Sequence, residues 1–307
     1  MAGVFIYSTP LIFAAMRHTL FLILVTLIFS ACEKDISVDL PAQEPQLVVE
    51  GRFEDGNYPV VILTHSLNYF AAIDQTTLQN SFVHNAVVTV SDGTKTMKLI
   101  ENLIDTAGKK FYVYIPDGTQ PANNFTGKVS GTYTLHINAD NKAYESVTTI
   151  PTRGLKLDSL WWTLVKLDND SSMARLWVRV TDSPTFGNYG RYFTSRNDEP
   201  FLPGLTSVVD DQVVNGTTFE IPVDAGVNKN ERLDLTTYAF FHLGDTVTIK
   251  FCNIDKATWD FWRTLDFAYN SNGNPFSSPT KILGNVPGAL GYWGGYAVTY
   301  KTIIISN

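Results

Sequence analysis

The chain has 307 residues, of which 44% are hydrophobic, 13% aromatic and only 17% charged, and its formal net charge at pH 7 is −7. This length allows two domains of ordinary size, and the absence of any block of Lys or Arg argues against nucleic-acid binding, which needs a basic surface. Its two cysteines, Cys32 and Cys252, allow at most one disulfide and show no zinc-ligand spacing.

The first predicted element is an export signal spanning residues 1–31. Its apolar core, residues 20–31, is too short to cross a bilayer as a helix and has the length of a signal-peptide core. The positive charge of such a signal normally stands at its start, yet Arg17 follows a first apolar stretch. We therefore expect Met16 to be the true start, with residues 1–15 an upstream extension.

The signal ends in the tetrad Phe-Ser-Ala-Cys, which resembles the lipobox of bacterial lipoproteins. We expect cleavage before Cys32 and lipidation of that cysteine, with palmitate among its acyl chains. Each buried methylene stabilises membrane attachment by about 0.8 kcal/mol, so several chains give a long-lived anchor. Two alternatives stay open, namely an uncleaved anchor helix and a plain signal peptide with an incidental cysteine. Residues 32–45, with two prolines and several charges, are predicted to form a lipidated tether.

A first β domain is predicted over residues 46–152. Strand-like segments with alternating or β-branched residues follow one another at short intervals: QLVVEGRF, YPVVILTHS, AVVTVSDG, TKTMKLI, FYVYI, GTYTLHIN and YESVTTI. Asp92-Gly93 adds a hairpin signal, because glycine accepts the positive φ of tight hairpin turns. This pattern favours an immunoglobulin-like or transthyretin-like sandwich.

A second, antiparallel β domain with one main helix is predicted over residues 153–307, after a boundary marked by Pro151 and Gly154. Apolar residues recur at helical spacing in IDKATWDFWRTLDFAYNS, which predicts a helix at about 255–269 capped by Asp255. Cys252 lies in a strand-like segment, where a small buried apolar role is the simplest interpretation. The predicted fold class is therefore mostly β.

Two segments carry aromatic residues that are candidates for ligand or partner contacts. Residues 272–296 are rich in glycine and proline, which predicts an irregular loop, and residues 67–85 form a long connection. Exposed rings there could stack on a sugar or peptide or anchor a protein. Alternatively, they pack back onto the sheets while glycines allow close backbone approach. The candidates are Tyr69, Phe70, Phe276, Tyr292, Trp293 and Tyr296.

Catalytic chemistry finds no support in the sequence motifs. The histidines after Cys32 stand alone without HExxH or HxH spacing, and there is no GxSxG elbow or papain-like cysteine signature. Carboxylate pairs cannot be chosen among 30 Asp and Glu residues. We therefore predict no catalytic residue, no metal site and no cofactor, and a protein that is not an enzyme.

Four blocks in order carry a family resemblance: CEKDISVDLPAQEPQLVVEGRFEDGNYPVVILTHSLNYF, TTIPTRGLKLDSLWW, IDKATWDFWRTLDF and GNPFSSPTKILGNVPGALGYWGGYAV. Together they resemble the Bacteroidota lipoprotein family catalogued as domain of unknown function 4249, from Cys32 to about Ile305. The resemblance implies an outer-membrane lipoprotein, commonly encoded beside a TonB-dependent receptor and without an established activity. It implies attachment by lipid on Cys32 and, from the charged residues after it, exposure at the cell surface.

The resulting functional prediction is a non-enzymatic binding or accessory module that works with a TonB-dependent outer-membrane receptor in nutrient uptake. Its ligand would be a small molecule, a glycan or a peptide. The alternatives are a structural or adhesive surface lipoprotein and, third, a hydrolase with an unrecognised site.

Overall fold

The computed structural model describes residues 44–67, 74–106, 109–167, 170–271, 278 and 280–306. The predicted signal peptide, Cys32 and the tether as far as residue 43 lie outside these residues. Glu44–Asn307 form one compact unit. It is mostly β and consistent with a β-sandwich, which confirms the predicted fold class.

Each strand predicted in the first half is present. Alternating buried and exposed residues produce these strands, because successive side chains of a strand point to opposite faces. An additional short helix, α2, is capped by Asp74, whose Oδ1 accepts a hydrogen bond from Thr77 N at 2.7 Å. The elements are β1 (Leu47–Glu54), β2 (Val60–His65), α2 (Gln75–Asn80), β3 (Val87–Ser91), β4 (Thr96–Thr106), β5 (Lys109–Pro116), the 3-10 turn η1 (Pro121–Asn123), β6 (Thr132–Ala139) and β7 (Lys142–Thr149).

The second half adds further strands and the predicted helix. That helix, α3, covers Lys256–Ser271, and Asp255 caps it as predicted, accepting a hydrogen bond from Thr258 N at 2.8 Å. The strands are β8 (Leu155–Leu167), β9 (Asp170–Asp182), β10 (Tyr189–Arg196), β11 (Leu202–Asp210), β12 (Thr218–Val223), β13 (Phe241–His242), β14 (Thr246–Ile254) and β15 (Leu290–Ile304).

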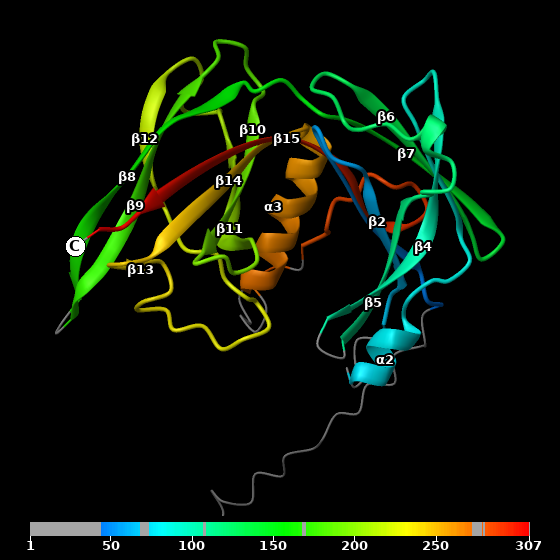
Figure 1. The fold of residues 1–307 in the computed structure, drawn as a ribbon, viewed down its shortest axis with the longest axis horizontal. Helices are drawn as coiled ribbons and strands as arrows, with labels where there is room; N and C mark the ends of the chain where they lie inside the picture. The colour runs from blue at the N-terminus through cyan, green and yellow to red at the C-terminus, as the bar shows by residue number, and fades with distance from the viewer. Residues whose placement is uncertain are drawn as a thin grey trace, which may run out of the picture. The chain divides into compact units, whose positions relative to one another are not determined.

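One mixed sheet runs through both halves (Figure 1). Within the described residues it has eleven strands in the order β11-β10-β14-β15-β1-β2-β5-β4-β3-β6-β7. The neighbours β1 and β15 are parallel, with Gly51 opposite Trp293, whereas β14 and β15 are antiparallel. The first and last described strands are thus hydrogen-bonded to each other, and β15 joins the sequence regions on either side of the predicted boundary at 152/153. The two-domain division stays a prediction.

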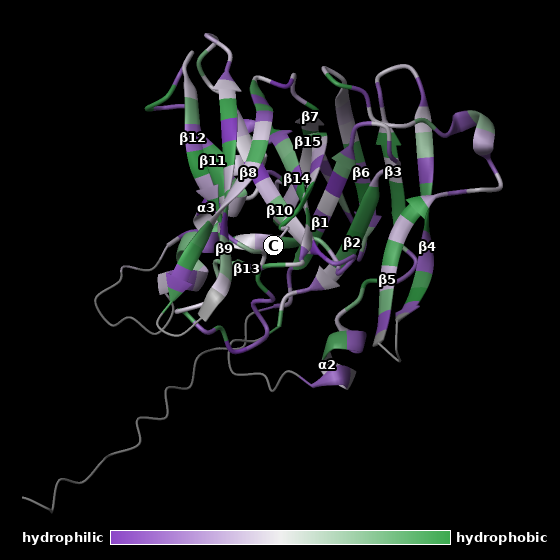
Figure 2. Cartoon of the chain, turned by 60° about the vertical axis from the view of Figure 1, so that its left-hand side comes forward, coloured by the Kyte–Doolittle hydropathy of each residue, from purple (hydrophilic) through white to green (hydrophobic). Residues whose placement is uncertain are grey.

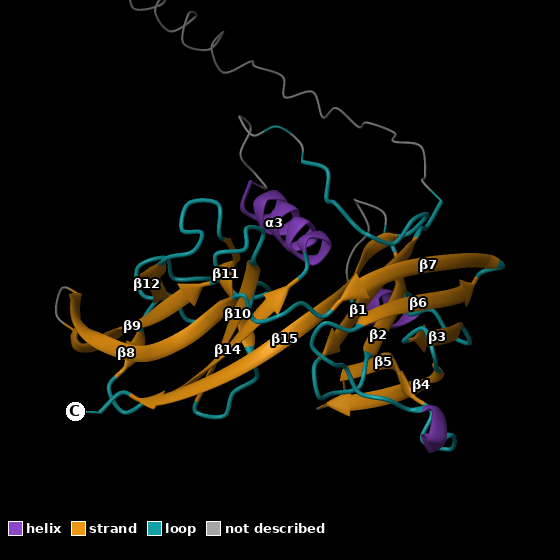
Figure 3. Ribbon diagram, turned by 90° about the horizontal axis from the view of Figure 1, so that it is seen from above, coloured by secondary structure: helices purple, strands orange, loops and turns teal. Residues whose placement is uncertain are grey.

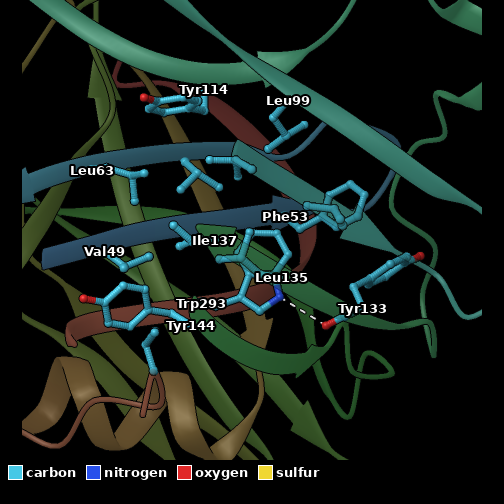
Figure 4. Close-up of a cluster of buried hydrophobic side chains, with 14 of the residues drawn as sticks. Val49, Phe53, Leu63, Leu99, Tyr114, Tyr133, Leu135, Ile137, Tyr144 and Trp293 are labelled. Carbon is cyan, nitrogen blue, oxygen red and sulfur yellow. Dashed lines mark hydrogen bonds between the residues drawn. The ribbon is translucent and has the colours of Figure 1, made fainter. Parts of the chain in front are cut away.

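The core of the first half forms where the sheet curls over itself. Tyr114, Leu135 and Val49 from separate strands pack in this core, and Trp293 of β15 enters it from the far end of the sequence (Figure 4). The Trp293 indole Nε1 donates a hydrogen bond to the Tyr133 carbonyl at 3.1 Å. A side chain of the last strand, β15, therefore helps to complete the core of the first half of the chain.

The second half has its own core between two sheets. A smaller sheet contains β12, β9, β13 and β8, and its apolar side chains pack against Val247, Ile249 and Phe251 of β14. Figure 2 shows bands of hydrophobic (green) and hydrophilic (purple) residues following one another along the strands. Asn253 of β14 is also buried there and closes this core by hydrogen-bonding both the amide and the carbonyl of Leu155.

Helix α3 covers the other face of β10, β14 and β15 (Figure 3). Trp259 and Phe261 are buried against this face together with Cys252, which confirms the buried apolar role predicted for the cysteine. Burial raises the pKa of its thiol to about 12. Gly294 of β15 permits the close packing, because a Cβ at this position would lie 2.7 Å from Thr258 Oγ1.

Asp255 connects α3 to the first half, so we expect its loss to destabilise the fold. Its Oδ2 accepts hydrogen bonds from Thr148 Oγ1 at 2.7 Å and Thr149 N at 3.3 Å, in addition to the cap on Oδ1. Asp255→Ala should lower the free energy of unfolding by about 2–3 kcal/mol, measured by urea denaturation. Asp74→Ala removes only the cap of α2, which has no buried residues, and is the control. An equal or larger effect at Asp74 would contradict this role.

Candidate ligand-binding cleft

The predicted contact residues have different outcomes. Tyr69, Phe70 and Phe276, like the lipidation site Cys32, lie outside the described residues, so they stay predictions. Tyr292, Trp293 and Tyr296 are described, and they lie in strand β15 rather than in an irregular loop. The loop predicted over residues 272–296 is therefore wrong from Leu290 onward.

Trp293 is not available to an external ligand. Its side chain is 0% exposed and packs against Phe53, with ring centroids 6.0 Å apart. It also covers Gly51, where an added Cβ would lie 2.6 Å from the indole ring. The alternative interpretation is correct at this position, because glycine on the neighbouring strand provides the space that the indole occupies.

Tyr292 and Tyr296 point to the opposite face of β15, toward α3. They are 2% and 3% exposed, so they are not the exposed stacking rings that the loop prediction implied. Tyr292 stacks on Phe261 of α3, with ring centroids 4.6 Å apart. Both tyrosines nevertheless line a cleft beside α3, where their buried rings form part of the wall.

This cleft has a volume of about 350 Å³, at the lower end of the roughly 300–1,000 Å³ that small-molecule sites occupy. Its walls combine aromatic and charged side chains from β1, β10, β14, β15, α3, the start of β11 and the segment between β12 and β13. The lining residues are Glu50, Arg52, Glu54, Arg191, Phe193, Phe201, Pro203, Lys229, Lys250, Trp262, Leu265, Tyr269, Tyr292 and Tyr296.

Arg191 is the most unusual of these residues because it is a cation that is only 4% exposed. Its guanidinium carbon lies 3.3 Å from the centroid of the Trp262 ring and 4.7 Å from that of Phe193. Its Nε donates a hydrogen bond to Ser207 Oγ at 3.1 Å. Two rings and one hydrogen bond therefore hold the guanidinium in one orientation.

The terminal nitrogens of Arg191 have no acceptor in the described part of the chain, and no described carboxylate lies within 4.0 Å of them. Among the described residues, the buried side-chain nitrogen and oxygen atoms without a partner are Arg175 Nε, Asp211 Oδ1 and Thr258 Oγ1. Both Nη atoms of Arg191 are absent from that set. They therefore keep some exposed surface, and Arg191 is one of the residues that line the cleft.

A chain of hydrogen bonds crosses the wall next to Arg191. Trp262 Nε1 donates to Tyr296 Oη at 3.0 Å, and Tyr296 Oη donates to Tyr292 Oη at 3.3 Å. Burial raises the pKa of both tyrosines, and for Tyr292 it does so far above the usual value. Both phenols therefore keep their protons at neutral pH, and Tyr292 retains a hydroxyl hydrogen that it can donate.

The other buried or half-buried cations of the cleft are paired. Lys250 Nζ lies 2.5 Å from Glu54 Oε1, and Lys229 Nζ lies 2.7 Å from Asp266 Oδ1. Asp266 also accepts a hydrogen bond from Ser207 N at 3.4 Å. Asp266, which is linked to Arg191 through Ser207, is therefore already paired with Lys229.

Three other cavities of the described chain are larger but less suited to hold a small ligand, and one of them, about 380 Å³, is lined mostly by exposed residues around the turn between β6 and β7. The remaining two are larger still. The first has a volume of about 780 Å³, and its lining includes Leu67, which is next in the chain to residues outside the described part. The second, about 620 Å³, lies beside β10, where its charged residues Arg196 and Glu199 pair with each other at 3.4 Å near the surface. Among the described lining residues, none of the three cavities contains a buried charge without an ion-pair partner.

In the described ranges no three His, Cys, Asp or Glu side chains are grouped so that they could hold a metal ion. Within the same ranges no helix has the length and apolar character needed to span a membrane.

The fold and the cleft define a mostly β protein with a small, partly cationic, aromatic-walled cleft beside its main helix. The chain belongs to the family described as a domain of unknown function, DUF4249, whose model matches residues 33–302. No curated protein matches the sequence significantly.

Proposed function

We propose that the protein is a lipid-anchored binding module of the outer membrane that works with a TonB-dependent receptor in nutrient uptake. The observation that supports a binding role is the cleft beside α3. Its aromatic walls and the free guanidinium edge of Arg191 are groups that hold a small ligand in place. Except for Phe201 and Lys229, the cleft residues are positioned by strands and a helix, so they are already arranged for binding.

Attachment to the membrane is supported by the sequence before residue 33. An apolar run, small residues and Cys32 follow one another there as in bacterial lipoproteins, and the family match starts immediately afterwards. The tether of residues 32–45 would keep the folded module concentrated above a receptor. Such tethering raises effective concentration without a tight interface.

Lipidation gives the first prediction of this proposal. The wild-type chain, expressed in its native host, should incorporate labelled palmitate and fractionate with the outer membrane. Cys32→Ser should abolish both, because the acyl chains have no other attachment point in the signal sequence. A matched Cys252→Ser variant should keep the label. Palmitate labelling that survives Cys32→Ser would contradict the anchor.

The receptor partnership is tested by purification of the C-terminally tagged full chain in mild detergent from the native host. We expect mass spectrometry to identify a TonB-dependent receptor that co-purifies with the wild-type chain. The Cys32→Ser variant serves as the matched control, because it retains the folded module but loses the membrane tether. Recovery of wild-type protein without any TonB-dependent receptor would contradict the partnership.

A further inference from the structure

We infer that the cleft beside α3 binds a small ligand that carries a carboxylate group, and that Arg191 receives this carboxylate. This inference rests on the proposed binding function and adds the chemical class of the ligand. It follows from the missing counter-charge of the buried Arg191, from the geometry of its two terminal nitrogens, and from the charges of the residues that line the cleft.

The charge of Arg191 is not neutralised by the described residues around it. Moving a cation from water into a protein interior is costly unless it is paired and hydrogen-bonded. Arg191 is buried, yet its nearest polar partner is the neutral hydroxyl of Ser207. The rings of Trp262 and Phe193 offset part of the cost through cation–π contact. A ligand anion would supply the missing counter-charge.

The free edge of Arg191 favours a carboxylate in particular. Arginine presents its donors in a planar fork that matches the two oxygens of a carboxylate. Because Ser207 occupies Nε and Trp262 lies over the guanidinium plane, the edge with Nη1 and Nη2 remains for a ligand. Tyr292 lines the same cleft, and its hydroxyl, which accepts a hydrogen bond from Tyr296, keeps a hydrogen that it can donate to a ligand.

The charge balance of the cleft also favours an anion. Four cationic and two anionic side chains line it, although the whole chain has a net charge of −7. Lys250 is paired with Glu54, and Lys229 is paired with Asp266. Among the lining residues, this leaves two positive charges, on Arg191 and the exposed Arg52, and one negative charge, on Glu50. The cleft is thus a local cationic site on an acidic protein, which attracts anions.

The rest of the ligand should be compact and at least partly flat. Phe193, Trp262 and Leu265 provide apolar wall next to the guanidinium. A volume of about 350 Å³ admits a small ring with a carboxylate but not an extended oligomer. An aromatic or cyclic carboxylate of the size of benzoate fits these limits.

The test is isothermal titration of the purified full chain in detergent with benzoate, benzamide and inorganic phosphate as probes. Benzoate should bind saturably, and benzamide, which has the same shape without the charge, should bind at least tenfold more weakly. Phosphate should compete poorly. Equal affinity for benzamide, tighter binding of phosphate than of benzoate, or no saturable binding of benzoate would each overturn the inference.

Variants of Arg191 locate the binding. Arg191→Met removes charge and fork at similar length and should weaken benzoate binding at least tenfold. Arg191→Lys retains the charge without the fork and should give an intermediate loss. Arg196→Met, on the same strand but outside the cleft, should bind as the wild type does. Unchanged binding in Arg191→Met would overturn the assignment. If that variant does not fold, the comparison of benzoate with benzamide on the wild-type chain still decides.

This titration is independent of the receptor experiment. Carboxylate binding by purified protein without a co-purifying receptor would leave the ligand class intact and remove the transport partnership. A co-purifying receptor without carboxylate binding would leave the transport partnership intact and remove the proposed ligand class.

Discussion

Trp293→Ala should lower the free energy of unfolding by about 3–5 kcal/mol, the range for removal of a fully buried tryptophan. The indole is 0% exposed, contacts Phe53 and fills the space over Gly51. Its removal also deprives the Tyr133 carbonyl of the Nε1 hydrogen bond. The loss combines apolar burial, cavity formation and one buried hydrogen bond.

Urea denaturation of the full chain in detergent, followed by circular dichroism, measures this effect. Ile304→Ala on the same strand is the matched control, because that side chain is 63% exposed. Its effect should not exceed about 0.5 kcal/mol. If the two variants unfolded at the same urea concentration, Trp293 would not belong to the core of the first half.

Gly291→Ala should destabilise the protein by more than about 2 kcal/mol, because this position is restricted in two ways. Gly291 has a φ of +93°, where a residue with a side chain is strained by about 1–3 kcal/mol. A Cβ there would also lie 1.9 Å from the carbonyl oxygen of Val49, the residue opposite it in the β1–β15 pairing. The substitution therefore separates the two strands at the start of their ladder.

Gly118→Ala is the control for this second substitution. Nothing lies within 4 Å of a Cβ added at Gly118. We expect a neutral or slightly stabilising effect there, up to about 1 kcal/mol, since alanine restricts the unfolded chain. Thermal unfolding of both variants gives the comparison. A Gly291→Ala protein as stable as Gly118→Ala would mean that β1 and β15 do not pair in the described register.

Local sequence patterns predicted the elements whose signals are local. Alternation in QLVVEGRF corresponds to β1, and the helical spacing with its Asp255 cap corresponds to α3. The segment GYWGGY was predicted as part of an irregular loop because residues 272–296 are rich in glycine and proline. In β15 these glycines instead meet distant neighbours: Gly295 faces the Thr149 backbone and Gly294 faces Thr258. Pairing with β1 and β14, which lie elsewhere in the sequence, holds this glycine-rich segment in a strand.

The cleft could not be predicted for the same reason. Arg191 lies in β10, Trp262 in α3 and Tyr292 in β15, so only the long-range pairing brings them together. Nothing in the segment RYFTSR distinguishes Arg191 from Arg196 except alternation, which places them on opposite faces of the strand. The sequence analysis named Tyr292 and Tyr296 as candidate contact residues, but only the structure shows that both rings are buried in the wall of the cleft.

The parallel pairing of β1 with β15 has a consequence for how the chain folds. Until residues 290–304 are available, β1 can pair only with β2, and its other edge remains open. Contacts of such large sequence separation are formed at a high entropic cost, which slows folding. Folding of the first half therefore cannot be completed before β15 has been synthesised. A chain that stops before residue 290 would expose a strand edge prone to aggregation.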